Sequence, residues 1–251
     1  SSRRRHTRCS RDWSSDVCSS DLRFRSLYLH FPFCETKCHY CDFYSIGAER
    51  TGASDPQLFA EHLIREAALW RDSLADRIDT IFLGGGTPSM TPPEDMARVF
   101  ETLGLAERVH PGTEWTMEAN PSSITVEKMR GYRALGINRV SMGVQAMRDD
   151  LLARLGRVHD SARAIRSLET LFEAGFTNVS VDLLCGVPGQ SLEILEEALA
   201  KLTAFPIRHL SCYLLTLPKS HRMFRELPEE AEQLRHLALI DQWMTPRGFR
   251  H

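Results

Sequence analysis

The sequence lacks the features that would place it in several common protein classes. No apolar run reaches the roughly 18 residues of a membrane-spanning helix, so a membrane span is not expected. The formal net charge is only −2 over 251 residues, which gives no strong attraction to nucleic acid or to an anionic membrane. The glycines at 84–86 lack the G-x-G-x-x-G spacing of a dinucleotide site, and no lysine completes a phosphate loop there.

A disulfide framework is also not indicated. The seven cysteines are odd in number and unevenly spaced, unlike those of a secreted disulfide-rich domain. A reducing, cytoplasmic location is therefore the better prediction. Three of the cysteines, Cys34, Cys38 and Cys41, follow an apolar run at 27–31 with the spacing C-x3-C-x2-C.

This cysteine loop has the residue types of a metal site. Three thiolates so close together cannot all pair as disulfides, and a tetrahedral zinc site needs four ligands. A 4Fe–4S cluster with three cysteine-held irons and one open iron fits better. Zinc with His39 as a fourth ligand is the alternative, although His39 is adjacent to Cys38 and would reach the same ion only with strain. Three cysteines buried by chance are the third reading.

The first 22 residues differ from the rest of the chain. They are rich in serine and arginine, have no apolar periodicity and lack the apolar centre of a secretory signal. They resemble translated adapter sequence, and we expect a non-native or disordered tail at 1–22. The predicted barrel domain then covers residues 23–251.

Beyond the tail, short apolar runs alternate with helical patterns. An Asp55–Pro56 start signal and a capping box opening at Thr91 predict two helices, and further helices are expected at 126–135, 161–174, 191–202 and 229–244. Strict alternation implies a parallel sheet, either open and doubly wound or curled into a partial barrel. The expected strands are 27–31, 80–83, 114–118, 139–144, 178–184 and 209–215.

Polar residues stand at the ends of these strands, where parallel sheets bind ligands. They are Glu118 and Gln145, with Asp182 inside the run at 178–184 and bare glycine backbone at 84–86. A carboxylate in an apolar run is costly unless it is paired, so each acid could equally be a satisfied structural residue. Taken on its own, Arg157 is interpreted as a solvated charge at a helix end. His30 is interpreted as a hydrogen-bonded core residue.

Six motifs in register carry a family resemblance. The cysteine loop is followed by GGGTPS at 84–89, EANP at 118–121, NRVSMGVQ at 138–145, LGRVH at 155–159 and DLLCGVPGQ at 182–190. The set resembles the radical S-adenosylmethionine superfamily, and within it the family of the heme chaperone HemW and oxygen-independent coproporphyrinogen III oxidase. The match runs from about residue 27 to 217 and implies a partial (β/α)6 TIM-like barrel of parallel strands with outer helices.

The resemblance also implies the site and its ligands. Cys34, Cys38 and Cys41 would hold the cluster, whose open iron binds S-adenosylmethionine. The cofactor-binding positions implied are Tyr40, Gly84, Gly85, Gly86, Thr87, Glu118, Gln145, Arg157 and Asp182. No further catalytic residue is assigned. In this family a reduced cluster cleaves the sulfonium, and a 5′-deoxyadenosyl radical abstracts hydrogen.

One position distinguishes the two branches of the family. The oxidase has a fourth cysteine two residues after the third, where this chain has Phe43. The resemblance therefore favours a heme chaperone, with heme or another tetrapyrrole, a low-potential electron donor and a hemoprotein acceptor as expected partners. The alternative is the oxidase itself, which oxidatively decarboxylates propionate side chains in porphyrin biosynthesis.

Two departures from the family pattern are visible. Cys185 replaces the usual aromatic residue of DLIYG, and we expect it to pack as a small apolar residue. The family's smaller carboxyl-terminal domain has no counterpart in these 251 residues, so a fragment is expected.

Overall fold

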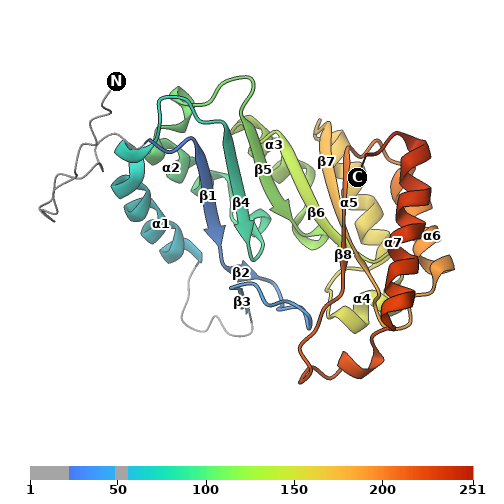
Figure 1. Ribbon diagram of the computed structural model, residues 1–251. Helices are drawn as coiled ribbons and strands as arrows, with labels where there is room; N and C mark the ends of the chain where they lie inside the picture. The colour runs from blue at the N-terminus through green and yellow to red at the C-terminus, as the bar shows by residue number, and fades with distance from the viewer. Residues whose placement is uncertain (1–22, 49–55, 251) are drawn as a thin grey trace, which may run out of the picture.

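The computed structural model describes residues 23–48 and 56–250, and its centre is one parallel sheet (Figure 1). The predicted tail at 1–22 and the helix-start residue Asp55 lie outside the described residues. Each strand pairs in parallel with its neighbour, in the order β1-β4-β5-β6-β7-β8. The strands are β1 (Ser26–Phe31), β4 (Thr80–Gly85), β5 (Glu114–Ala119), β6 (Arg139–Gln145), β7 (Asn178–Cys185) and β8 (His209–Leu214).

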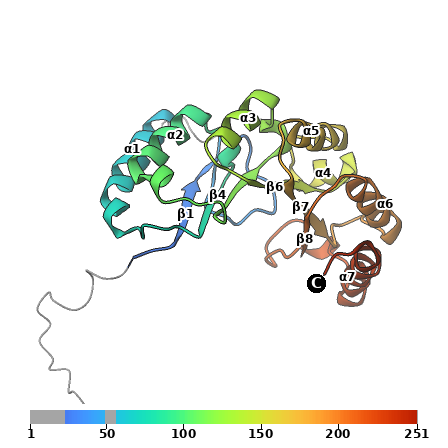
Figure 2. The same cartoon turned by 90° about the horizontal axis from the view of Figure 1, so that it is seen from above.

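The order of the strands in this sheet decides between the two predicted architectures. A doubly wound sheet reverses its strand order at a switch point, whereas here spatial order follows chain order throughout. Viewed from above, the helices form an arc on the outer side of a curved sheet (Figure 2). The partial barrel is therefore confirmed. The helices are α1 (Pro56–Trp70), α2 (Pro93–Leu103), α3 (Val126–Ala134), α4 (Asp149–Leu155), α5 (Ser161–Glu173), α6 (Leu192–Thr203) and α7 (Glu230–Met244).

Side-chain caps fix the starts of three helices. Thr125, Asp160 and Ser191 accept backbone N–H groups at the first turns of α3, α5 and α6. The capping box predicted at Thr91 is wrong, because α2 begins at Pro93 with no side-chain cap. Pro93 forces the residue before it out of helical geometry, so Pro92 stays extended (φ −57°, ψ 142°) and the helix starts later.

The two faces of the sheet differ in polarity. Side chains toward the helices are apolar and fully buried, as in Leu83, Met117 and Val181. Cys185 is also buried, as predicted. Glu118 and Asp182, which follow Met117 and Val181 along their strands, are only partly buried. This alternation is the two-residue period of a strand, and it puts the polar set on the inner face of the arc.

The sequence did not indicate three elements. The short strands β2 (Phe33–Cys34) and β3 (Ile46–Gly47) pair in parallel and frame the cysteine loop. Helix α4 precedes Arg157 and packs Leu151, Leu152 and Leu155 into a second apolar cluster, separate from the main core. Among the helices of the described residues, none has both the length and the apolar character needed to cross a bilayer.

Candidate functional site

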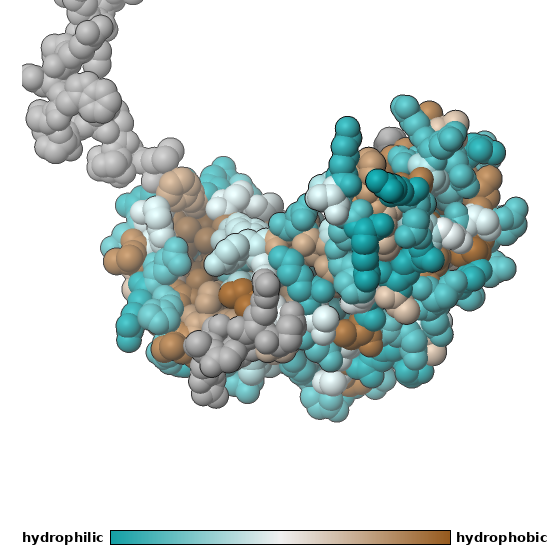
Figure 3. All heavy atoms as spheres, turned by 90° about the horizontal axis from the view of Figure 1, so that it is seen from below, coloured by the Kyte–Doolittle hydropathy of each residue, from teal (hydrophilic) through white to brown (hydrophobic). Residues whose placement is uncertain are grey.

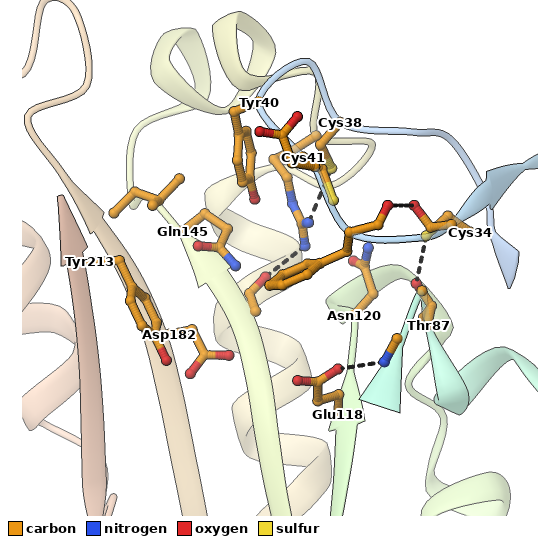
Figure 4. A pocket seen from close by; sticks show the side chains of 18 of the residues that line it. Cys34, Cys38, Tyr40, Cys41, Thr87, Glu118, Asn120, Gln145, Asp182 and Tyr213 are labelled. Atoms are coloured by element: carbon orange, nitrogen blue, oxygen red, sulfur yellow. Dashed lines mark hydrogen bonds between the residues drawn. The ribbon is translucent and has the colours of Figure 1, made fainter. Parts of the chain in front are cut away.

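A cavity of about 470 Å³ lies at the carboxyl ends of the strands, within the usual size range of small-molecule sites. Its lining joins the cysteine loop to residues from strands far apart in the sequence (Figure 4). The predicted site residues found in the lining are Cys34, Cys38, Tyr40, Cys41, Gly85, Gly86, Thr87, Glu118, Gln145, Arg157 and Asp182.

The cysteine loop is held over this cavity by backbone bonds. The N–H of Ile46 donates to the carbonyl of Pro32 (2.7 Å), and that of His39 donates to Leu155 at the end of α4 (3.0 Å). Cys41 N–H donates to the Cys38 carbonyl (3.2 Å), which closes a tight turn between two thiols. Cys34, Cys38 and Cys41 are all unpaired and partly buried. Three reduced sulfurs therefore face one space.

Two of these sulfurs receive hydrogen bonds from outside the loop. Thr87 Oγ1 donates to Cys34 Sγ (3.6 Å), and Arg157 Nη1 donates to Cys38 Sγ (3.3 Å). Arg157 also donates to the carbonyl of Gly143 (2.7 Å). The reading of Arg157 as a solvated charge is thus wrong: α4 and the turn after it direct the guanidinium into the cavity. Burial raises the pKa of the Cys34 thiol.

The arrangement of the donors fits a cluster better than a single ion. Within residues 23–48 and 56–250, no three His, Cys, Asp or Glu side chains form a group that could hold one metal ion. A zinc ion needs its thiolates at about 2.3 Å from a single centre. The cysteines of a 4Fe–4S cluster instead bind separate irons and stand further apart. Cys34, Cys38 and Cys41 line one cavity together, but they do not form a group placed to hold a single ion.

Two carboxylates face the cysteine loop across the cavity. Glu118, from β5, accepts the Gly85 N–H (3.1 Å), but burial raises its pKa to about 7, with a further contribution from Asp182. Asp182, from β7, accepts from Ser141 Oγ (3.1 Å), and burial likewise raises its pKa. Each acid is only partly satisfied by protein groups. Their oxygens remain available to hydroxyl or amino groups of a ligand.

Backbone geometry directs the strand ends toward the same space. Gln145 has φ +69°, the one non-glycine residue with positive φ in the described chain, and the β6–β7 register shifts between Gly143 and Gln145. A positive φ and a register shift at the end of a strand change the direction in which the side chain points. A Cβ on Gly86 would lie 2.6 Å from the Phe33 carbonyl oxygen, so only glycine fits there. Gly84, two residues before Gly86, is paired with His30 in the sheet and does not line the cavity.

Tyr40 and His30 support the loop from its two sides. Tyr40 lines the cavity and packs against the second apolar cluster, and burial raises its hydroxyl pKa. His30 is hydrogen-bonded as predicted, by Tyr28 Oη (2.9 Å) and the Tyr44 carbonyl (2.9 Å). It is partly exposed rather than a core residue. These contacts tie the cysteine loop to β1.

Several lining residues were not predicted from the sequence. Asn120 directly follows β5, and Ser141 lies on the inner face of β6 beside Asp182. The polar-after-strand signal that marked Glu118 would also have found Asn120. Tyr213 of β8 is 56% exposed and stands opposite the cysteine loop (Figure 4). No sequence signal distinguishes Tyr213 from other strand tyrosines.

Comparison with known proteins gives a consistent set of relatives. Residues 28–202 match the Radical SAM superfamily. The heme chaperone HemW of Bacillus subtilis (strain 168) is 36% identical over 200 residues, covering 78% of this chain and 52% of the relative. HemW of Haemophilus influenzae is 35% identical, covering 81% and 54%. The chain thus spans about half the length of the curated relatives it matches.

Solved structures show the same fold. Coproporphyrinogen III oxidase (HemN) from Escherichia coli, described as a radical SAM enzyme, superposes with a TM-score of 0.80 at 25% identity. The superposition covers 92% of this chain and 55% of that one. The native anSMEcpe structure with bound AdoMet matches at a TM-score of 0.64 and 13% identity, which supports the fold alone.

Proposed function

Because this chain belongs to the radical SAM superfamily, we propose that Cys34, Cys38 and Cys41 hold a 4Fe–4S cluster and that the adjoining cavity binds S-adenosylmethionine. The observation that carries the proposal is the shared cavity: three free thiols from one loop meet Glu118 and Asp182 from separate strands. When bound, the cluster and S-adenosylmethionine supply one-electron chemistry that protein side chains cannot perform.

The residues around the cavity have distinct roles in this proposal. Gly85 and Gly86 offer backbone close to the ligand's amino-acid end, while Glu118, Gln145 and Asp182 accept or donate hydrogen bonds to its polar groups. Arg157 and Thr87 orient the cysteine sulfurs through the bonds at 3.3 and 3.6 Å. Tyr40 closes the cavity beside the third cysteine and limits the access of water.

At the level of the whole protein, we infer a heme chaperone that binds heme and transfers it to an acceptor protein. The named HemW relatives at 35–36% identity support this inference. So does Phe43, which is 72% exposed at the position where the oxidase branch has a fourth cysteine. The second candidate is coproporphyrinogen III oxidase, supported by the superposition on HemN.

Anaerobic reconstitution with iron and sulfide tests the cluster. We expect about four irons and four sulfides per chain, and visible absorbance that Cys38→Ala abolishes. Cys212→Ala serves as the matched control, because Cys212 lies in β8 and does not line the cavity. A Cys38→Ala protein with the full cluster content would contradict the assignment.

Titration with heme, and anaerobic incubation with coproporphyrinogen III, S-adenosylmethionine and a one-electron reductant, separate the two functions. A chaperone binds heme stoichiometrically and leaves the porphyrinogen unchanged, whereas an oxidase releases carbon dioxide and forms protoporphyrinogen. Robust turnover would overturn the chaperone proposal. Because the chain spans about half of its relatives, the same two assays on a protein of the relatives' full length complete the test.

A further inference from the structure

The end of β6 contains a γ-turn, a three-residue turn centred on Gln145. The Ala146 N–H donates to the Val144 carbonyl (2.9 Å), and the φ of +69° makes this the rare, strained form of the turn rather than the common inverse form. Val144 is buried in the main core and Ala146 in the second apolar cluster. The turn therefore joins two packed regions, and Gln145 projects from it into the cavity (Figure 4).

The side chain of Gln145 depends on this turn for its direction. Within residues 23–48 and 56–250, its amide group makes no hydrogen bond. Seen from below, where the strands end, the surface is hollowed between the two halves of the molecule, so a side chain at this mouth can also turn toward solvent (Figure 3). A Cβ on Gly143 would lie 2.9 Å from Gln145 Nε2, so the amide folds back over bare glycine backbone. The backbone conformation thus decides where the amide lies.

His159 holds the carbonyl on which the turn closes. Its Nε2 lies 3.2 Å from the Val144 oxygen, and because that oxygen can only accept, Nε2 carries the proton and donates. Burial, with Arg157 close by, lowers the pKa of His159 to about 4, so the ring is neutral. The residue is 5% exposed, and among the described residues its Nδ1 has no partner. An apolar side chain would fill this space without burying an unpaired nitrogen, so packing does not explain a histidine here.

The neighbouring carbonyl is held from the same loop. Arg157 Nη2 donates to the Gly143 oxygen (2.7 Å), and His159, two residues later, donates to the Val144 oxygen. The loop after α4 therefore fixes two consecutive carbonyls at the end of β6. Arg157 also reaches a cysteine sulfur, whereas His159 does not line the cavity. Any effect of His159 on a bound ligand must pass through the turn.

We propose that His159 is a positioning residue that holds the strained turn and so directs the Gln145 amide toward S-adenosylmethionine in the cavity. This inference rests on the proposed function, because it takes Gln145 as a ligand contact. The bond from Nε2 offsets the strain of a positive φ, and the amide is in place before the ligand arrives. Loss of the bond leaves the cysteine loop unchanged but frees Gln145 to turn away.

Binding of S-adenosylmethionine to the reconstituted chain, measured by equilibrium dialysis, tests the proposal. His159→Leu removes the donor, and we expect the dissociation constant to rise about tenfold, the size of one lost hydrogen bond, at full cluster content. His159→Gln places an amide N–H near the position of Nε2 and should bind within about threefold of the wild type. In a Gln145→Ala background, His159→Leu should change the constant by less than about twofold, because its effect passes through Gln145.

Amide hydrogen exchange in the protein before reconstitution gives a second measurement that needs no cluster. The Ala146 N–H, which closes the turn, should exchange about tenfold faster in His159→Leu, while the Met142 N–H in the middle of β6 keeps its rate. His236→Leu is the matched control, because His236 is also buried and contacts a backbone carbonyl, that of Gln190 (3.1 Å), outside the cavity lining. It should leave both measurements within about twofold of the wild type.

Three results would overturn the positioning role of His159. They are unchanged binding in His159→Leu, a full further loss of binding in the Gln145→Ala background, and equally faster exchange at Met142 and Ala146. Each of them would leave the cluster assignment intact. Failure of the wild type to assemble a cluster or to bind S-adenosylmethionine would instead contradict the proposed function itself.

Discussion

The outer and inner faces of the sheet are built from alternate residues of the same strands, yet the two faces have different roles. On β7, Val181 and Leu183 point toward the helices and are fully buried in the main apolar core. Asp182, between them, points to the inner face and hydrogen-bonds Ser141 of β6. On β5, Met117 is likewise buried against the helices, whereas Glu118 lies on the inner face and lines the cavity.

A parallel sheet covered on both faces normally has near-continuous apolar strands. The inner face here departs from that rule because it carries Glu118 and Asp182, both of which are partly buried. This burial raises the pKa of each carboxyl group. Burial of this kind costs stability unless the groups are paired. The difference teaches that the outer face stabilises the barrel, while the inner face is arranged for a ligand.

The largest expected effect separates two adjacent residues. Leu183→Ala, on the outer face, should lower the free energy of unfolding by about 2–5 kcal/mol, because it opens a cavity in the main core. Asp182→Asn, on the inner face, should leave that free energy unchanged or slightly higher, since it removes a partly desolvated charge and keeps an acceptor for Ser141. Denaturant unfolding measures both.

The same pair should behave in the opposite way in ligand binding. Asp182→Asn should weaken S-adenosylmethionine binding to the reconstituted protein, whereas Leu183→Ala at a temperature where it is folded should not. If Asp182→Asn proved as destabilising as Leu183→Ala, the inner face would be structural and the comparison would fail.

A smaller effect is expected in the dependence of stability on pH. Burial raises the folded-state pKa of Glu118 to about 7, from an ordinary value of 4.5. A raised pKa contributes stability that is fully present below about pH 4.5 and is lost as the pH rises toward 7. The contribution amounts to at most about 3 kcal/mol. Glu118→Gln should remove this loss, so that its stability relative to the wild type increases between pH 4.5 and 7.

The control for this titration is Glu101→Gln, an exposed acid on α2 whose replacement should leave the pH profile unchanged. Parallel profiles for the wild type and Glu118→Gln across this window would show that the carboxyl group is ionised without cost. The inner face would then be better solvated than its burial indicates.

The smallest effect concerns the hydrogen bond from Thr87 to Cys34. A donor to a cluster sulfur stabilises the more negative, reduced state, so Thr87→Val should lower the reduction potential of the cluster. The change should correspond to about 1 kcal/mol or less, because sulfur is a weak acceptor. Thr87→Ser keeps the hydroxyl group and should restore the potential. Equal potentials in all three proteins, measured by redox titration, would exclude this contact from the loaded site.

Much of the barrel was predictable because its signals are local. The apolar runs at 80–83 and 139–144 are β4 and β6 to within two residues, and caps such as Asp160 fix helix starts through their own side chains. The capping box at Thr91 failed on a local rule as well, the effect of Pro93 on the residue before it. Helix α4 was missed because seven residues give little periodicity, and its stability comes from packing Leu151 and Leu155 against distant parts of the chain.

The sequence by itself determined the three-cysteine spacing, the acids Glu118 and Asp182 within apolar strands, and the βα alternation, since each depends on residues close together along the chain. Only the tertiary structure decided the curvature of the sheet, the entry of Arg157 into the cavity and the approach of residues 218–226 to His39. Those features join segments that are up to 183 positions apart, and no local pattern encodes which distant side chains will meet once the barrel closes around its core.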